Sequence, residues 1–125
     1  KAKVEVCDLY NPKSNNFIHV KYKKRGSSGL SHLFSQAFVS SKLISEDKDM
    51  MKFINSVLSE IDSNLIIPDD KKSKDFSVTI CILEESNNKL VDALPFFSKI
   101  NLLSRVKSIS DLGFTVYVNL VHPQN

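Results

Sequence analysis

No apolar run in this 125-residue sequence approaches the roughly 20 residues that a membrane-spanning helix requires. The first residues also lack the charged, apolar and small-residue order of a secretory signal segment. We therefore expect no membrane partner. The chain starts with Lys-Ala-Lys rather than methionine, which suggests a fragment of a longer protein, and the remainder of that parent chain is then an expected partner.

Cysteine and glycine are scarce as well. Cys7 and Cys81 have no metal-binding CxxC spacing and lie in strand-like runs, which favours two buried reduced thiols over a disulfide. Reduced thiols are typical of a reducing compartment, so we expect a cytoplasmic location. Gly26 and Gly29 do not belong to a GxxxxGK[ST] loop of the kind that cradles phosphates, which argues against a nucleotide-binding P-loop.

The net charge of +3 is unevenly distributed along the chain. Residues 1–45 contain eight basic and two acidic residues, whereas residues 46–125 contain nine basic and twelve acidic residues. A basic element on a mildly acidic body suits a polyanionic partner such as DNA or RNA, although solubility alone explains the same pattern. The length and the 42% content of hydrophobic residues predict one globular domain over 1–125.

The first half of the chain predicts a hairpin followed by two helices. Alternating apolar residues indicate strands over 4–10 and 17–23, joined by a loop rich in turn formers. After a Ser/Gly turn, Ser27 or Ser28 is the expected N-cap of a helix that packs through Leu30, Leu33, Phe34 and Ala37. A second helix is predicted over 45–64, capped by Ser45 and buried through Met50, Ile54, Val57, Ile61 and Leu65.

The second half predicts two more strands around a last helix. A charged loop over 68–75 precedes a nearly continuous apolar run over 76–83, which is typical of a central strand covered on both faces. Ser98 is the expected cap of a helix that packs through Leu102, Leu103, Val106 and Ile109, and a final strand follows Gly113. The order β-β-α-α-β-α-β predicts the α/β class, with a mixed sheet of about four strands flanked by helices.

The residues with the most unusual chemistry surround the second predicted strand. Because residues two apart in a strand share a face, His19 and Lys21 point the same way. If the hairpin places Asp8 beside them, an acid, an imidazole and an ammonium converge at one end of the sheet. Gln36 lies four residues after His32 on the next helix and shares its face. Glu84 and Glu85 end the central strand and could reach the Asp8 position.

An acid on one strand, a tripeptide ending in Lys on the next strand and a Gln on the following helix resemble the restriction-endonuclease-like nuclease superfamily. The resemblance implies cleavage of phosphodiesters with Mg²⁺ or Mn²⁺. It also implies Asp8, His19, Lys21 and Gln36 as catalytic residues, with Asp8 and His19 as metal ligands. His19 departs from the superfamily, which has Asp or Glu there, and histidine suits hard Mg²⁺ poorly.

A second resemblance covers nearly the whole chain. The stretches "VEVCDLY", "FIHVK", "LSHLFSQAFVS" and "LPFFSKINL" are similar to the C-terminal region of a family of uncharacterised, sporadically distributed bacterial proteins. Their patchy distribution suggests a defence-associated role, but the resemblance implies no particular activity.

Two non-catalytic interpretations remain open. A binding module would contact the phosphates and bases of DNA or RNA through Lys21, Tyr22, Lys23, Lys24 and Arg25. In a structural or protein-interaction domain of a larger protein, the same residues form a solvated strand end, and His19 is a hydrogen-bonded strand residue. For residues 94–100 the pattern favours burial over an exposed docking patch.

Overall fold

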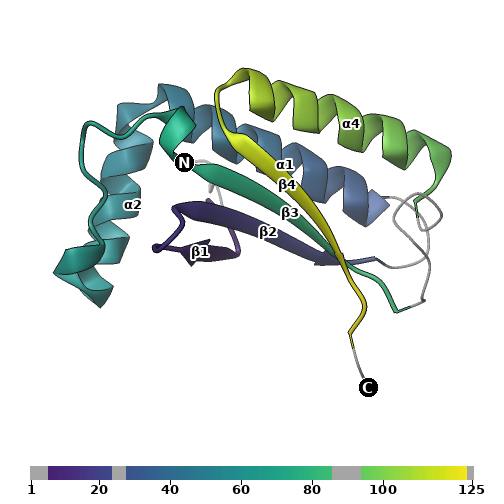
Figure 1. Ribbon diagram of the computed structural model, residues 1–125, viewed down its shortest axis with the longest axis horizontal. Coiled ribbons are helices and arrows are strands. Elements are labelled where there is room, and N and C mark those ends of the chain that lie inside the picture. The colour runs from purple at the N-terminus through teal and green to yellow at the C-terminus, as the bar shows by residue number, and fades with distance from the viewer. Residues whose placement is uncertain (1–5, 24–27, 86–93, 124–125) are drawn as a thin grey trace.

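The computed structural model describes residues 6–23, 28–85 and 94–123 (Figure 1). Its elements are, in chain order, β1 (Leu9–Asn11), β2 (Asn16–Tyr22), α1 (Ser28–Glu46), α2 (Lys48–Ile61), the 3₁₀ turns η1 (Ser63–Leu65) and η2 (Ser73–Asp75), β3 (Ser77–Leu83), α4 (Phe96–Asp111) and β4 (Thr115–Val121). The α/β class, the four-stranded mixed sheet and the predicted order of elements are confirmed.

The strands lie in the sheet in the same order as in the chain, β1-β2-β3-β4. The β1–β2 hairpin is antiparallel, with Leu9 opposite Ile18, and its turn includes Asn15 at a φ of 49°. The pairs β2–β3 and β3–β4 are parallel and in register, so that His19, Ile80 and Val118 form one row across the sheet.

The helices of both parallel crossovers cover the same face of the sheet. Crossovers between parallel strands are right-handed in nearly all proteins, and here both advance in the same direction, so their helices must lie on one side. Figure 1 shows α1 and α4 side by side along the sheet, with α2 near the end where the parallel strands begin.

The opposite face of the sheet is open among the described residues. Three of its side chains, Tyr22, Tyr117 and Val121, are 44%, 52% and 42% exposed. The prediction that the 76–83 strand is central is confirmed, and no residue of β3 is exposed, but within the described residues helices cover only one of its faces. The continuous apolar sequence of β3 has another cause, because this interior strand is enclosed laterally by the side chains of β2 and β4.

The hydrophobic core lies between the sheet and the helix layer. Val78, Ile80 and Ile82 of β3 face it with no exposed surface, and Phe34 and Ala37 of α1 pack from the other side. This confirms the packing that the apolar spacing of the first helix predicts. Cys7 and Cys81 are reduced thiols, each half-buried, and burial raises the pKa of Cys81.

Several helix boundaries differ from the prediction. Ser45 lies in the last turn of α1, and the N-cap of α2 is Asp47, whose carboxylate accepts a hydrogen bond from the Asp49 amide at 2.9 Å. At the other end of the chain, α4 begins at Phe96 directly after Pro95. Ser98, the predicted cap, is instead buried within the helix.

Three apolar residues that were predicted to be buried are exposed. Val57 and Ile61 of α2 are 43% and 72% exposed, because this helix contacts the rest of the core through Ile54 and Leu58. Leu103 of α4 is 69% exposed, since α1 and the sheet meet the helix on the side of Leu102. Among the described residues, no helix is long and apolar enough to cross a membrane.

Residues 94–100 are only partly buried, which corrects the prediction of burial for this segment. Leu94 and Ser98 are enclosed, but Phe96 and Phe97 are 68% and 79% exposed and stack edge to face with each other. For residues 90–97, interrupted by Pro95, the sequence favours a buried irregular segment or a short helical turn, and the first half of that segment, 90–93, lies outside the described residues.

Candidate functional site

The carboxyl ends of the three parallel strands meet at one edge of the sheet, where ligands commonly bind in α/β proteins. Lys21, Tyr22 and Lys23 lie there, at the end of β2. Lys21 is exposed and passes close to the first turn of α1, where a Cβ on Gly29 would lie 3.4 Å from its Cε. Lys24 and Arg25, which the sequence assigns to the same basic element, lie outside the described residues.

The positive charge of Lys23 is paired within the domain. Its Nζ lies 3.3 Å from Oε2 of Glu84, and both side chains are largely buried. The backbone carbonyl of Glu84 lies 3.2 Å from Nδ1 of His122. Lys23 therefore anchors the end of β2 to the end of β3, and its charge is largely neutralised at this edge. Glu84 follows β3 and lies beside Lys23, beyond the row of the sheet that contains His19. It is therefore not placed to form a carboxylate pair with Asp8.

The hairpin brings Asp8 beside His19. The amide of Asp8 donates to the carbonyl of Ile18 at 3.0 Å, one residue out of the register in which Leu9 lies opposite Ile18. Oδ2 of Asp8 accepts a hydrogen bond from the Val20 amide at 2.8 Å. The juxtaposition that the sequence allows is present, and one carboxylate oxygen is already engaged by the backbone.

His19 points into the core beneath the helix layer and is only 2% exposed. Burial lowers its pKa to about 4, and the nearby Asp8 carboxylate opposes this shift without reversing it. The ring is therefore neutral at physiological pH. Its Nε2 has no hydrogen-bond partner among the described residues.

These donors fit a hard divalent cation poorly. Mg²⁺ is usually held by carboxylate oxygens and water, whereas this site offers one carboxylate and a buried neutral imidazole. Within residues 6–23, 28–85 and 94–123, no group of three or more His, Cys, Asp or Glu side chains could hold a metal ion. Of the other predicted catalytic residues, Lys21 is exposed at the edge and Gln36 is half-buried on α1. His32 is exposed on the same helix.

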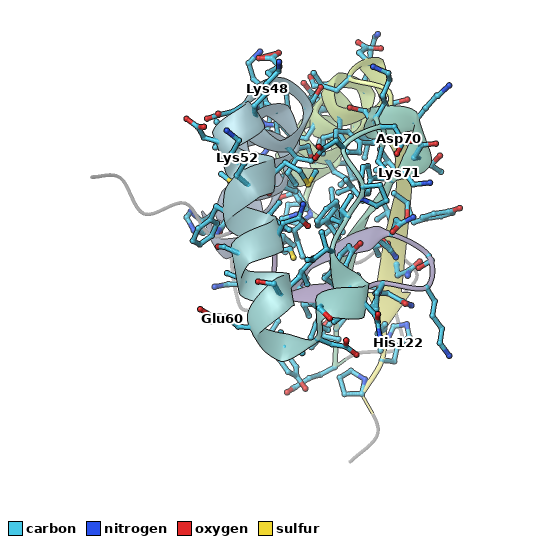
Figure 2. All side chains as sticks on the ribbon, turned by 90° about the vertical axis from the view of Figure 1, so that its left-hand side faces the viewer. Lys48, Lys52, Glu60, Asp70, Lys71 and His122 are labelled. Carbon is cyan, nitrogen blue, oxygen red and sulfur yellow. The ribbon has the colours of Figure 1, made fainter. Side chains whose placement is uncertain are left out.

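A concave site lies at the opposite, amino edge of the parallel strands. This cleft of about 800 Å³ is formed by the junction of α1 with α2, by residues 68–74 and by the turn before β4. We call it the lysine cleft, after the side chains that surround it, Lys48, Lys52, Lys71, Lys72 and Lys74. Figure 2 looks onto this end of the domain, with Lys48 and Lys52 on α2 and Lys71 across from them.

The five lysines of the cleft are exposed, and none of them forms an ion pair within the described residues. Three acids also line the cleft, but two of them are engaged elsewhere. Glu46 pairs with Lys42 at 3.4 Å, and Asp47 caps α2. Asp69 is the third. The cleft therefore presents a surplus of uncommitted positive charge.

The backbone around the lysine cleft is held in place by specific contacts. The Asn55 side chain forms two hydrogen bonds with Ile67, donating to its carbonyl at 3.0 Å and accepting from its amide at 2.8 Å. Gly113 has a φ of 108°, and a Cβ there would lie 3.1 Å from the Cβ of Ser73. Asn55 thus fixes the chain between α2 and residues 68–74, and Gly113 allows the turn before β4 to pack against η2.

Sequence reasoning did not identify this cleft. The charged loop over 68–75 and the lysines of α2 are visible in the sequence, but they are separated by about twenty residues. One feature of the sequence could have indicated the cleft: the i, i+4 spacing of Lys48 and Lys52 places both lysines on one side of a helix.

The fold and these two edges define a small α/β domain with its helices on one face of a four-stranded mixed sheet. The chain belongs to a family described as "Family of unknown function (DUF6119)", whose model matches residues 1–122. Kinship with a family of unknown function over nearly the whole chain is thereby confirmed, whereas the comparisons show no link to the nuclease superfamily. No curated protein and no solved structure matches the chain.

Proposed function

We propose that this domain contacts nucleic acid without cleaving it, and that the lysine cleft supplies the main phosphate contacts. One observation carries the proposal: five exposed lysines, none of them ion-paired within the described residues, surround a single cleft. Lysines that keep their charge can displace the counterions of a phosphate backbone, which is the main source of non-specific affinity for nucleic acids.

The carboxyl edge is the weaker candidate for this contact. Lys23 already has a carboxylate partner, so it offers less attraction to a phosphate than an unpaired lysine does. Lys21 and Tyr22 are exposed there and could add a phosphate contact and a stacking surface. The proposal does not include a metal-dependent step, because the donors around Asp8 and His19 do not suit Mg²⁺.

The test compares two variants of the whole chain that lose the same charge. The cleft variant carries Lys52→Gln, Lys71→Gln and Lys74→Gln. The control carries Lys13→Gln, Lys99→Gln and Lys107→Gln, at three lysines outside the cleft lining, of which two are exposed and Lys99 is half-buried. Affinity for labelled DNA and RNA is measured by fluorescence anisotropy over a range of salt concentrations.

We expect the cleft variant to bind at least about tenfold more weakly at low salt. The slope of log K against log salt should fall by about one for each lysine that no longer neutralises a phosphate. The control should bind nearly as the native chain does. If both variants lost affinity equally, the loss would be due to net charge and the lysine cleft would not be the binding site. If the native chain did not bind at low salt, the proposal would be refuted. Cleavage of the same nucleic acids with Mn²⁺, abolished by Asp8→Ala, would refute its non-catalytic part.

A further inference from the structure

β4 is a long edge strand without the usual protection. It pairs with β3 along all seven of its residues, and no described strand pairs with its outer edge. Natural edge strands are commonly short or carry lysine, proline or a bulge, which prevents pairing with other chains. The other edge of this sheet follows that rule, since β1 has only three residues. The sequence of β4, TVYVNLV, contains neither charge nor proline.

The helix above β4 exposes an apolar strip. Phe96, Ile100 and Leu103 are spaced i, i+4 and i+7 on α4, and they are 68%, 48% and 69% exposed. Arg105 marks the side of α4 that faces α1, because its guanidinium lies 5.2 Å from the Phe38 ring centroid and 3.3 Å from the Ser35 hydroxyl. The strip lies away from that side and toward the same flank of the domain as the outer edge of β4.

We propose that a second copy of this chain pairs with the outer edge of β4, so that the two sheets become one continuous sheet across a twofold axis. The pairing is antiparallel and centred on Val118, which then lies opposite its own copy. This register pairs all seven residues of β4 and keeps both helix layers on the same face.

The side chains of β4 suit this pairing. On the helix face Val116 lies opposite Leu120 of the second copy, and on the open face Tyr117 lies opposite Asn119. The Val116–Leu120 pairs bury apolar surface between the two strands, and no like charges, which would destabilise the pairing, meet anywhere along the seven residues. A strand with a different sequence could form the same backbone hydrogen bonds. The β4 strand of a second copy, however, also offers compatible side chains on both faces of the sheet.

The helices match the same axis. α4 has sixteen residues and is about 24 Å long, whereas the seven residues of β4 span about 23 Å. The two elements run in opposite directions, so the midpoint of α4, at Leu103, lies level with Val118. In the dimer the exposed Leu103 side chains of both copies therefore approach each other near the twofold axis, and they extend the apolar contact from the sheet to the helix layer.

The first experiment measures the mass of the chain by analytical ultracentrifugation over a concentration series. The native chain is expected to dimerise. The variant Tyr117→Lys with Asn119→Lys places lysines opposite lysines in the proposed register and should weaken the dimer at least about tenfold. Tyr22→Lys, at an exposed position on the same face but on β2, is the matched control and should leave the dimer unchanged.

A second experiment tests the register and does not depend on the fold of one variant. A chain with Tyr117→Glu and Asn119→Glu, mixed with the lysine chain, should form a heterodimer more tightly than either chain forms a homodimer. In the otherwise native chain, Leu103→Cys should yield a disulfide-linked dimer on mild oxidation, whereas Ile61→Cys, on the distant helix α2, should not. A monomer at every concentration, or a dimer unaffected by the lysines on β4, would overturn the inference.

Discussion

The carboxyl and amino ends of the parallel strands both carry lysines, and the two sets differ in what lies beside them. At the carboxyl end, Lys23 is paired with the buried Glu84. At the amino end, the lysines of the cleft are exposed and have no acidic partner among the described residues. A lysine from a basic run in the sequence can thus stabilise the fold through an ion pair. Lysines from segments far apart in the chain gather at the cleft, where their charge is available to bind an anion.

The largest effect is expected at His19, which lies in the core on the strand that leads to the carboxyl end. Its pKa is about 4 in the folded chain and near 6.5 when unfolded, so the folded state favours the neutral ring. The contribution of His19 is fully present above pH 6.5 and is lost as the pH falls toward 4. The loss amounts to roughly 3 kcal/mol.

Urea unfolding across this pH range measures the loss. In a His19→Phe variant the corresponding part of the pH dependence should disappear, because no imidazole remains to be protonated. An equal loss in the variant would assign the acid sensitivity to other groups.

The next largest effect is expected for Glu84→Gln. The substitution leaves the mostly buried ammonium of Lys23 without its carboxylate and should cost about 2 kcal/mol in the free energy of unfolding. Affinity for nucleic acid should not fall, since an acid is removed. If Glu84→Gln weakened binding while leaving stability intact, the roles assigned to the two ends would be reversed.

A smaller effect is expected for Gly113→Ala beside the lysine cleft. The positive φ is unfavourable for alanine, and the new Cβ would press on Ser73, so the cost should be about 1.5 kcal/mol. Thermal unfolding measures it. Gly29→Ala is a suitable control, because a Cβ there makes only ordinary contact with Lys21 and should change stability much less.

The smallest effect on stability is expected for the three cleft substitutions Lys52→Gln, Lys71→Gln and Lys74→Gln. These exposed side chains form no ion pair within the described residues, so the free energy of unfolding should change by less than about 0.5 kcal/mol. Urea titration with the binding assay thus separates the two ends of the sheet: variants at one end affect stability, and those at the other affect binding. A large destabilisation by the cleft variant would remove this distinction.

Much of the fold could be predicted from local patterns. The hairpin turn, the apolar run of β3 and the i, i+3, i+4, i+7 spacing from Leu30 to Ala37 each depend on neighbouring residues, and each is found in the structure. The errors concern which surface another element covers. Val57 and Leu103 follow the apolar spacing of their helices, but no described element packs over them.

The site was predictable only in part for the same reason. The alternation of strand residues places His19 and Lys21 on one face of their strand but leaves the pairing register of the hairpin open, so the position of Asp8 near His19 could not be predicted. That His19 would be enclosed beneath α1 depends on how the helix layer packs. The lysine cleft depends on a contact between segments far apart in the chain, and Gly113 against Ser73 is an example of such a contact.

The strands lie in the sheet in the same order as in the chain, and this order has a consequence for folding during synthesis. Each strand of the β1-β2-β3-β4 sheet pairs with the strand before it, and none has to enter between two strands that are already joined. A chain emerging from the ribosome can therefore add each strand to an edge that already exists, since N-terminal segments become available first during synthesis. The last strand to be added is β4, so the outer edge of the finished sheet is also the most recently synthesised part of it.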